Sequence, residues 1–272
     1  MRWTENNWAA NRTRLLAGVL ILAMGVLLVY FLRPGTEYSN EVLIGVSDDA
    51  GGLVVDYLIR NQDMPNRRIK VEQSLFKDCC SSSGEWALGS GRLDLALLCP
   101  DAAARLVARD KRYEIVGPCL VNSDILVVRS GIKPKKIGIT QNRWYQKRLA
   151  LKQFKDCQVI SMLPGALPYA YEKGVVDGVV VDVGKGLYLK GQHHSINLDG
   201  KDTVTSVLVV SKKFKQNPSF QRLMVNWNNA VEELNRPAVL QQEINAYYET
   251  TSTDKEAGQW KEMGVQFTQP TQ

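Results

Sequence analysis

Histidine is the residue type that this 272-residue chain most nearly lacks, because only 2 copies occur. They are adjacent, at His193 and His194, and no partner lies at a spacing typical of a zinc site. Histidine is the usual acid–base group at neutral pH, and neither a Ser/His/Asp order nor a helix with paired carboxylates is present. The sequence therefore disfavours hydrolytic enzymes and predicts that both histidines are surface residues without a metal.

Long basic runs are missing as well. Lys and Arg number 34 against 28 Asp and Glu, which gives a net charge of +6, but these charges are dispersed. Without a stripe of basic and aromatic residues, nucleic acid is not an expected partner. The Lys-Ser/Thr ending of a phosphate loop does not follow Gly84, Gly89 or Gly91, and no C-x-x-C motif occurs. The positive balance fits a protein that lies beside an anionic membrane or cell wall.

An uncharged, mostly apolar segment of 18 residues runs from Leu15 to Leu32. As an α-helix it would be about 27 Å long, close to the thickness of the hydrocarbon core of a bilayer. Arg12 and Arg14 precede it, whereas only Arg33 follows closely, so the basic excess predicts a cytoplasmic N-terminus. We therefore expect a single-pass anchor that contacts membrane lipid and holds the rest of the chain on the extracytoplasmic face of the cell membrane.

A cleaved signal peptide is the competing interpretation of this segment. The apolar run is long for the h-region of a signal peptide, and no A-x-A site follows Leu32. No cysteine comes directly after it, so a lipoprotein anchor is not indicated. The predicted layout is a cytoplasmic N-terminus at 1–14, a transmembrane signal anchor at 15–32 and a linker at 33–40.

Beyond the linker, strand-like and helix-like runs alternate. The strand-like runs are mostly apolar and end at turn residues. This alternation is typical of βα units and of a mostly parallel sheet. The expected strands are 41–46, 68–74, 93–98, 136–140, 158–162 and 178–183, and the expected helices are 53–61, 83–90, 101–109, 143–154 and 167–173.

An internal repeat divides this region into two halves. Gly91 and Asp94 lie at the start of GRLDLAL, and Gly174 and Asp177 lie at the start of GVVDGVV, each unit following a helix-like run. In each unit the glycine can end its helix in the left-handed conformation, and the aspartate can turn the chain into the strand. Two such units at corresponding points predict two similar α/β lobes.

Two long β-rich runs connect the halves. Residues 120–129 lead out of the first half, and residues 203–211 lead back to it before a helical region near 218–234. Two crossing segments form a hinge, and a hinge allows closure over a ligand. The sequence therefore predicts an α/β fold of two lobes. Lobe 1 is expected at 41–128 plus 203–272 and lobe 2 at 129–202.

The opening segment IGVSDDAGG, the paired segments WALGSGRLDLALLC and YAYEKGVVDGVVVDV and the crossover strand SDILVVRSG carry a family resemblance. With them, residues 41–235 resemble the two-lobed periplasmic solute-binding proteins of ABC transporters, of type II with two crossovers. The nearest subgroup binds sulfonates, nitrate and thiamine precursors. The resemblance implies the periplasmic-binding-protein fold, capture of a small molecule between the lobes without catalysis, and delivery to a permease and its ATPase subunit.

Two adjacent cysteines, Cys79 and Cys80, depart from that family, because many relatives place hydroxyl or amide donors for an anion in this loop. The pattern SSGE at 82–85 is typical of a capping box, which puts both thiols just ahead of a helix N-terminus. The helix dipole there lowers the pKa of a thiol, and thiolates bind soft metals. A buried or disulfide-bonded structural role is the alternative. The pair is also similar to that of the solute-binding component of an organometal transport system, some members of which carry selenocysteine there. That likeness implies a thiophilic metal species as ligand, organomercury above all.

Ligands of open α/β sheets bind at the carboxyl ends of the strands. Cys99 ends a predicted strand, so it could complete a three-thiol site with the cysteine pair or form a structural disulfide with one of the two. Asp182 lies in a valine-rich strand, so its carboxylate needs a partner or a function. The predicted ligand contacts are Cys79, Cys80, Ser81, Cys99, Asp49, Asp182 and Met162, and the predicted metal ligands are Cys79, Cys80 and Cys99.

Four functions stay open at this point. The first is a non-enzymatic binding protein of an ABC importer, with a soft metal or organometal as its ligand and no other cofactor. The same fold could instead bind a small sulfur- or nitrogen-containing organic anion at helix N-termini. A membrane-anchored thiol enzyme, either a redox protein or a lyase, is disfavoured by the missing C-x-x-C motif and the scarce histidine. Cys119 and Cys157 are expected to be structural, and a sensor that signals to a membrane partner would share the fold.

Overall fold

The computed structural model describes residues 18–19, 22–25, 41–61, 70–76, 83–197, 200–250 and 255–270. The chain divides into two compact units, Met1–Tyr38 and Ser39–Gln272. Residues 18–19 and 22–25 are helical, and the remainder of the predicted anchor at 15–32 lies outside the described residues. Within the described ranges, no helix combines the length and the apolar character that a membrane crossing needs.

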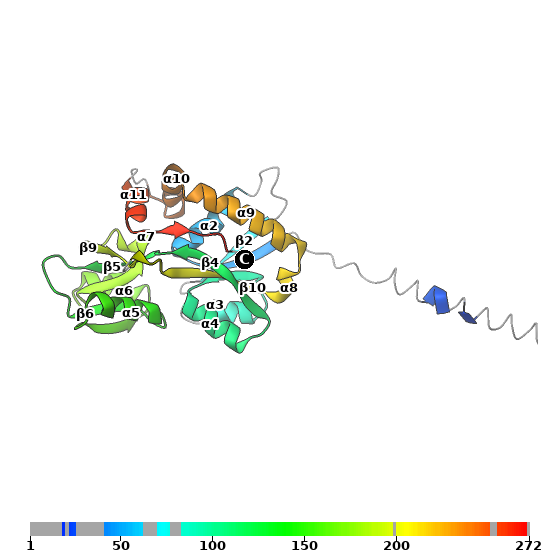
Figure 1. Cartoon of the computed structure of the whole chain (residues 1–272), viewed down its shortest axis with the longest axis horizontal. Coiled ribbons are helices and arrows are strands. Elements are labelled where there is room, and N and C mark those ends of the chain that lie inside the picture. Colours follow the sequence, from blue (N-terminus) through cyan, green and yellow to red (C-terminus); the bar gives the residue numbers. More distant parts are fainter. Residues whose placement is uncertain are drawn as a thin grey trace, which may run out of the picture. The chain divides into compact units, whose positions relative to one another are not determined.

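The first of two sheets has six strands. They are β1 (Glu41–Ser47), β2 (Lys70–Phe76), β3 (Leu95–Leu98), β4 (Tyr113–Val121), β10 (Val204–Ser211) and β11 (Gln266–Phe267) (Figure 1). β1 lies between β2 and β3 and is parallel to both, and Ile44 is aligned with Gln73 on one side and Leu95 on the other. β10, β4 and β11 continue the sheet beyond β3, each antiparallel to the strand before it.

The second sheet has five strands. They are β5 (Asp124–Val128), β6 (Lys136–Thr140), β7 (Gln158–Met162), β8 (Gly178–Asp182) and β9 (Gln192–Ser195). β6 is parallel to both β7 and β8, and β5 pairs with β8 and β9 in antiparallel directions. Both sheets are therefore mixed, whereas the sequence predicted mostly parallel ones. The difference arises because β10 and β5 cross between the sheets, so each enters its sheet at the carboxyl ends of the parallel strands and runs against them.

The predicted crossing run at 120–129 is two strands in different sheets. β4 ends at Val121, and β5 begins three residues later at Asp124. Between them Asn122 has a φ of 56°, and its side chain donates to Gly264 O at 2.9 Å and accepts from Thr203 N at 2.8 Å. This fixed corner turns the chain from one sheet to the other. Residues 124–128 therefore belong to the second sheet, although the predicted lobe 1 extended to residue 128.

The two Gly-x-x-Asp units have the same structure in both halves. Gly91 and Gly174 each have a φ of 73°, the left-handed conformation in which a helix ends. Asp94 accepts from Leu43 N at 3.0 Å, and Asp177 accepts from Lys136 N at 2.9 Å. In each half the aspartate therefore joins the entry of one parallel strand to its neighbour, and the predicted repeat is confirmed as a structural one.

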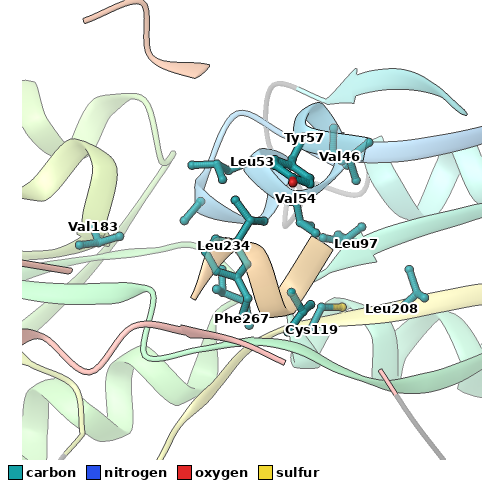
Figure 2. Packing of buried hydrophobic residues seen from close by; sticks show 14 of the residues in the cluster. Val46, Leu53, Val54, Tyr57, Leu97, Cys119, Val183, Leu208, Leu234 and Phe267 are labelled. Carbon is teal, nitrogen blue, oxygen red and sulfur yellow. The ribbon is translucent and has the colours of Figure 1, made fainter. Parts of the chain in front are cut away.

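Helices cover both sheets. They are α2 (Ala50–Arg60), α3 (Ser83–Gly89), α4 (Pro100–Arg109), α5 (Trp144–Gln153), α6 (Ala166–Glu172), α7 (Val183–Gly186), α8 (Lys212–Lys215), α9 (Pro218–Leu234), α10 (Pro237–Tyr247) and α11 (Lys255–Glu262) (Figure 1). One buried apolar cluster includes residues of both sheets, and Figure 2 shows part of it, from Leu53 and Leu97 to Val183 at the start of α7. The sequence did not predict α10, α11 or β11.

Candidate functional site

Two pockets lie where the carboxyl ends of the parallel strands of the two sheets face each other. The outer pocket is lined by Asp48, Asp49, Thr140, Arg143, Asp182 and Lys185 among others, and it holds about 390 Å³ of space that is partly open to solvent. The inner pocket is lined by Asp49, Cys99, Ser123, Asp124, Arg143, Asp182, Thr205 and Ser206 among others, and it holds about 270 Å³. Because Asp49, Arg143 and Asp182 line both, the two pockets form one cleft.

Asp124 is the most buried carboxylate of the cleft, with 1% of its surface exposed. Arg143 Nη1 lies 3.2 Å from both of its carboxylate oxygens, and Tyr145 Oη and Gln146 Nε2 each donate to Oδ2 at 2.5 Å. All three donors come from the start of α5, which Arg143 caps. A buried ion pair is stable only when its remaining hydrogen-bonding positions are filled, and here Tyr145 and Gln146 fill those of Asp124.

Asp182 links the two sheets directly. It is the N-cap of α7, where its Oδ1 accepts from Gly184 N at 3.0 Å, and its Oδ2 accepts from Ala50 N of α2 at 3.0 Å. One carboxylate therefore caps two helices from opposite sides of the cleft. Burial and the neighbouring Asp49 carboxylate raise the pKa of Asp182 to about 8. The closed cleft therefore favours the un-ionised form of this carboxyl group.

Further polar contacts cross the cleft nearer to solvent. Lys185 of α7 lies 3.0 Å from Asp48, and Arg143 Nη2 lies 3.8 Å from Asp49. On the α4 side, Arg105 binds Glu85 and donates to the backbone oxygen of Asn142 at 3.3 Å. The lobes are thus in direct contact through side chains of both, which describes a closed arrangement of the cleft.

The predicted site residues have different outcomes. Cys79, Cys80 and Ser81 lie outside the described residues, so the cysteine pair stays a prediction. Asp49 and Asp182 do meet in the cleft, each as the N-cap of a helix. Cys99, at the start of α4, lines the inner pocket, and 2% of this residue is exposed. Met162 ends β7 and packs against the apolar core, and it is not among the pocket-lining residues.

Neither of the other two described thiols belongs to the cleft. Cys119 and Cys157 are buried, and burial raises the pKa of both thiols. His193 and His194 are half-buried in β9 rather than surface residues, because β9 pairs with β5 as an edge strand of the second sheet. Across the ranges that the structure covers, no cluster of three His, Cys, Asp or Glu side chains could hold a metal ion.

Arg143, Asp124 and Lys185 are the functional candidates that the sequence did not reveal. Asp124 lies in an otherwise apolar run, and a carboxylate in such a run needs a buried partner. The partner is supplied 19 residues later by Arg143, whose position depends on the start of α5. Only the fold places the two together, although the apolar surroundings of Asp124 were a usable signal.

Comparisons with known proteins agree with this architecture. The aliphatic sulphonate binding protein of Escherichia coli is similar at a TM-score of 0.63, with 16% identity over 84% of this chain and 85% of that chain. A ligand-binding component of an ABC-type import system from Staphylococcus aureus, with zinc bound, gives 0.64, with 15% identity over 84% and 85%. The alkanesulfonate-binding protein of Xanthomonas axonopodis bound to MOPS gives 0.61, with 15% identity over 86% and 88%.

No protein-family model matches the chain, and no curated protein matches its sequence. At identities this low, the likeness establishes the fold. The chain has the two-lobed fold of the periplasmic solute-binding proteins of ABC importers, as its sequence motifs predicted.

Proposed function

We propose that this chain is the solute-binding component of an ABC importer, held at the extracytoplasmic face of the membrane by residues 15–32. It would capture a small molecule in the cleft between its sheets and pass it to a permease and its ATPase subunit. The cleft is the observation that carries this proposal. It lies at the carboxyl ends of strands of both sheets, where open α/β folds bind ligands, and its walls touch through side chains such as Asp182 that only closure brings together.

The charges of the cleft favour a cationic ligand. Among the described lining residues, the three carboxylates of Asp48, Asp49 and Asp124 face two cations, Arg143 and Lys185, and Asp182 adds a fourth acidic group whose pKa is raised. An anion would have to bind beside this excess of carboxylates, whereas a cation would reduce it. A cation in the cleft would oppose the raised pKa of Asp182, since the opposite charge stabilises the ionised carboxylate.

A thiophilic metal species is the sharper form of this ligand, with organomercury first and Cu(I) next. Cys99 supports it because this residue lines the inner pocket together with Asp49 and Asp182. Cys79 and Cys80 precede α3 in the sequence, and we infer that they supply the other soft ligands. Thiolate binding releases protons, so the affinity should rise with pH until the thiols are ionised.

A small organic anion is the second candidate, and Arg143 is the observation that favours it. Arg143 lines both pockets, and the N-terminus of α2 lies at the same cleft, where Asp182 and Asp49 accept from its Ala50 and Gly51 amides. A sulfonate or carboxylate could pair with the Arg143 guanidinium and with backbone N–H groups. Asp124 already binds Arg143 through two contacts of 3.2 Å, which weakens this candidate.

Ligand titration of the reduced full-length protein in detergent separates the two candidates. Methylmercury, Cu(I), taurine and MOPS are the probes, and binding is measured by calorimetry and by the melting temperature. The test variant changes Cys79 and Cys80 to Ser together. The matched control is Cys157→Ser, which also removes a thiol but lies directly before β7, and Cys157 lines neither pocket.

The metal proposal predicts tight binding of methylmercury or Cu(I), its loss in the double variant and its retention in the control. Retained affinity in the double variant, or binding of taurine or MOPS alone, would transfer the function to the organic anion. Failure of all four probes to bind or to stabilise the protein would count against the cleft as a site for either class. Protease treatment of spheroplasts tests the anchor, because an exported body should be digested while the intact membrane protects the N-terminus.

A further inference from the structure

The two tyrosines at the end of α10 contact opposite sides of the cleft. Tyr247 and Tyr248 are consecutive, and their rings pack edge to face with centroids 4.9 Å apart. α10 itself packs against α2 and α9 of the first lobe, with Leu240 and Ile244 in the buried core. The dipeptide therefore belongs to the first lobe by its packing.

Tyr247 is fixed on α2. Its hydroxyl donates to Ser47 O at 3.4 Å, where β1 ends. It also occupies the space beside Gly52, since a Cβ added at Gly52 would lie 2.1 Å from the Tyr247 hydroxyl. Only glycine lets the ring come this close to the first turn of α2.

Tyr248 reaches the other lobe in the same manner. Its hydroxyl lies 3.4 Å from Asp182 Oδ1, and a Cβ added at Gly184 would lie 2.2 Å from that hydroxyl and 2.4 Å from Tyr248 Cζ. At Gly184 the three nearest atoms are all from Tyr248, so the missing side chain makes room for this ring. Each tyrosine thus sits on a glycine in the first turn of a helix whose N-cap is a cleft aspartate, Asp49 for α2 and Asp182 for α7.

We propose that Tyr247 and Tyr248 are positioning residues that hold the two aspartate-capped helix starts together and keep the cleft closed. The tyrosine pair then forms a third connection between the lobes, in addition to the crossing strands. Two further contacts of the C-terminal region support this role, because Glu256 of α11 accepts from Tyr188 at 2.7 Å and Met263 O accepts from Ser195 at 2.6 Å. The inference rests on the proposed function only in that closure is the motion by which a solute would be captured.

Closure of the ligand-free full-length protein is the quantity to measure. Fluorescent amino acids introduced in place of Gln221 and Lys155, both exposed and on different lobes, report the distance between the lobes by energy transfer. Hydrogen exchange of the Ala50 amide reports its contact with Asp182 independently. Near-UV circular dichroism of each variant establishes that the fold is retained.

Tyr248→Ala should lower the transfer efficiency and speed the exchange of the Ala50 amide about tenfold. Tyr248→Phe keeps the ring on Gly184 and should leave both readings close to those of the unchanged protein. Tyr169→Ala is the control, because Tyr169 is an exposed tyrosine of α6. Gly184→Ala should open the cleft while Tyr248 is present and add nothing in the Tyr248→Ala background.

Unchanged readings in Tyr248→Ala would overturn the proposal. So would additive effects of Gly184→Ala and Tyr248→Ala, since the glycine would then serve α7 alone. If Gly184→Ala fails to fold, the comparison of Tyr248→Ala with Tyr248→Phe still decides, because equal opening in both would exclude the ring as the positioning element. No ligand is added, so a failure of the proposed solute binding leaves these readings unaffected.

Discussion

The two sheets share their architecture but not the chemistry at their strand ends. In the first, β1 lies between β2 and β3, and in the second β6 lies between β7 and β8, with the same parallel directions. An antiparallel strand follows in both, β10 in one and β5 in the other. The halves are thus two copies of one α/β arrangement that differ in what they present to the cleft.

Corresponding strand ends carry different side chains. After the central strand, the first sheet places Asp49 and the second places Arg143. After the next parallel strand, the first sheet places Cys99 and the second Asp182. The acidic ends of each half therefore face a thiol or a guanidinium of the other. Strand geometry therefore comes from the repeated pattern, whereas the site comes from residues in which the copies diverge.

The largest expected effect is on Asp124, for which the first sheet has no equivalent. Asp124→Ala would remove the carboxylate at 3.2 Å from the buried Arg143 guanidinium, which would keep the more distant Asp49 at 3.8 Å. Removing one partner of a buried ion pair costs about 3–5 kcal/mol of unfolding free energy. Urea denaturation of the variant should show this loss. Asp156→Ala, which breaks the exposed pair with Lys133, should produce no comparable change, and equal costs would contradict the buried-pair interpretation.

The second-largest expected effect is the pH dependence of the unfolding free energy that Asp182 produces, which Cys99, its counterpart in the first sheet, is not expected to share. Burial and Asp49, with a smaller contribution from Asp124, raise the pKa of Asp182 to about 8. The Ala50 N–H and Lys185 oppose this shift, and Tyr248 also contacts the carboxyl group. A raised carboxyl pKa contributes stability that is fully present below the ordinary value near 4 and is lost as the pH rises to about 8.

Unfolding free energies measured in urea between pH 5 and pH 8 should therefore fall for the unchanged protein and fall less steeply for Asp182→Asn. Asp94 and Glu243 also have pKa values raised mainly by burial, so some slope remains in the variant. Identical slopes in the two proteins would mean that Asp182 is ionised in the closed cleft at neutral pH.

The repeated Gly-x-x-Asp unit tests how far the likeness of the halves extends. Asp94→Ala removes one hydrogen bond to Leu43 N, and Asp177→Ala removes two, to Lys135 N and Lys136 N. Hydrogen bonds to a charged acceptor contribute about 1.5–3 kcal/mol each at most, and less when they are exposed to water. The single bond of Asp94 is partly buried and the two bonds of Asp177 are exposed, so both variants should lose similar amounts of unfolding free energy in urea denaturation. A loss of stability in only one variant would mean that the two halves share the backbone conformation of the unit but not the contribution of its aspartate to stability.

Much of the fold was predictable because it depends on local patterns. The strands at 136–140 and 158–162 and the helix at 218–234 match their predicted limits, since each is an apolar run between turn residues or a capped helix. The corner at Asn122 was not predictable, because its side chain is held by Thr203 N and Gly264 O from distant parts of the chain.

In the candidate site too, residues placed by local patterns were predictable, and residues placed by distant contacts were not. Asp49 comes shortly after the predicted strand 41–46, and Asp182 lies near the carboxyl end of the predicted strand 178–183, so position along the strands indicated both. Arg143 looks like an ordinary first residue of a helix, and its role depends on Asp124 across the lobe. Tyr248 lies beyond the last predicted helix, and nothing in the local sequence signals the space beside Gly184.

The smallest expected effect concerns the two structural thiols, Cys119 in β4 and Cys157 directly before β7. Burial raises the pKa of Cys119 well above its usual value and raises that of Cys157 as well. The thiolate is the reactive form, so both thiols should resist iodoacetamide at pH 7.5 in the native protein. Cys119 should resist it longer, because 1% of this residue is exposed against 8% of Cys157. Peptide mass spectrometry after timed alkylation measures both rates in one sample, and alkylation in urea supplies the unprotected reference. Rapid native labelling of Cys119 would mean that β4 opens locally. Labelling would then not distinguish this structural thiol from Cys79, Cys80 and Cys99, the thiols proposed to bind the ligand.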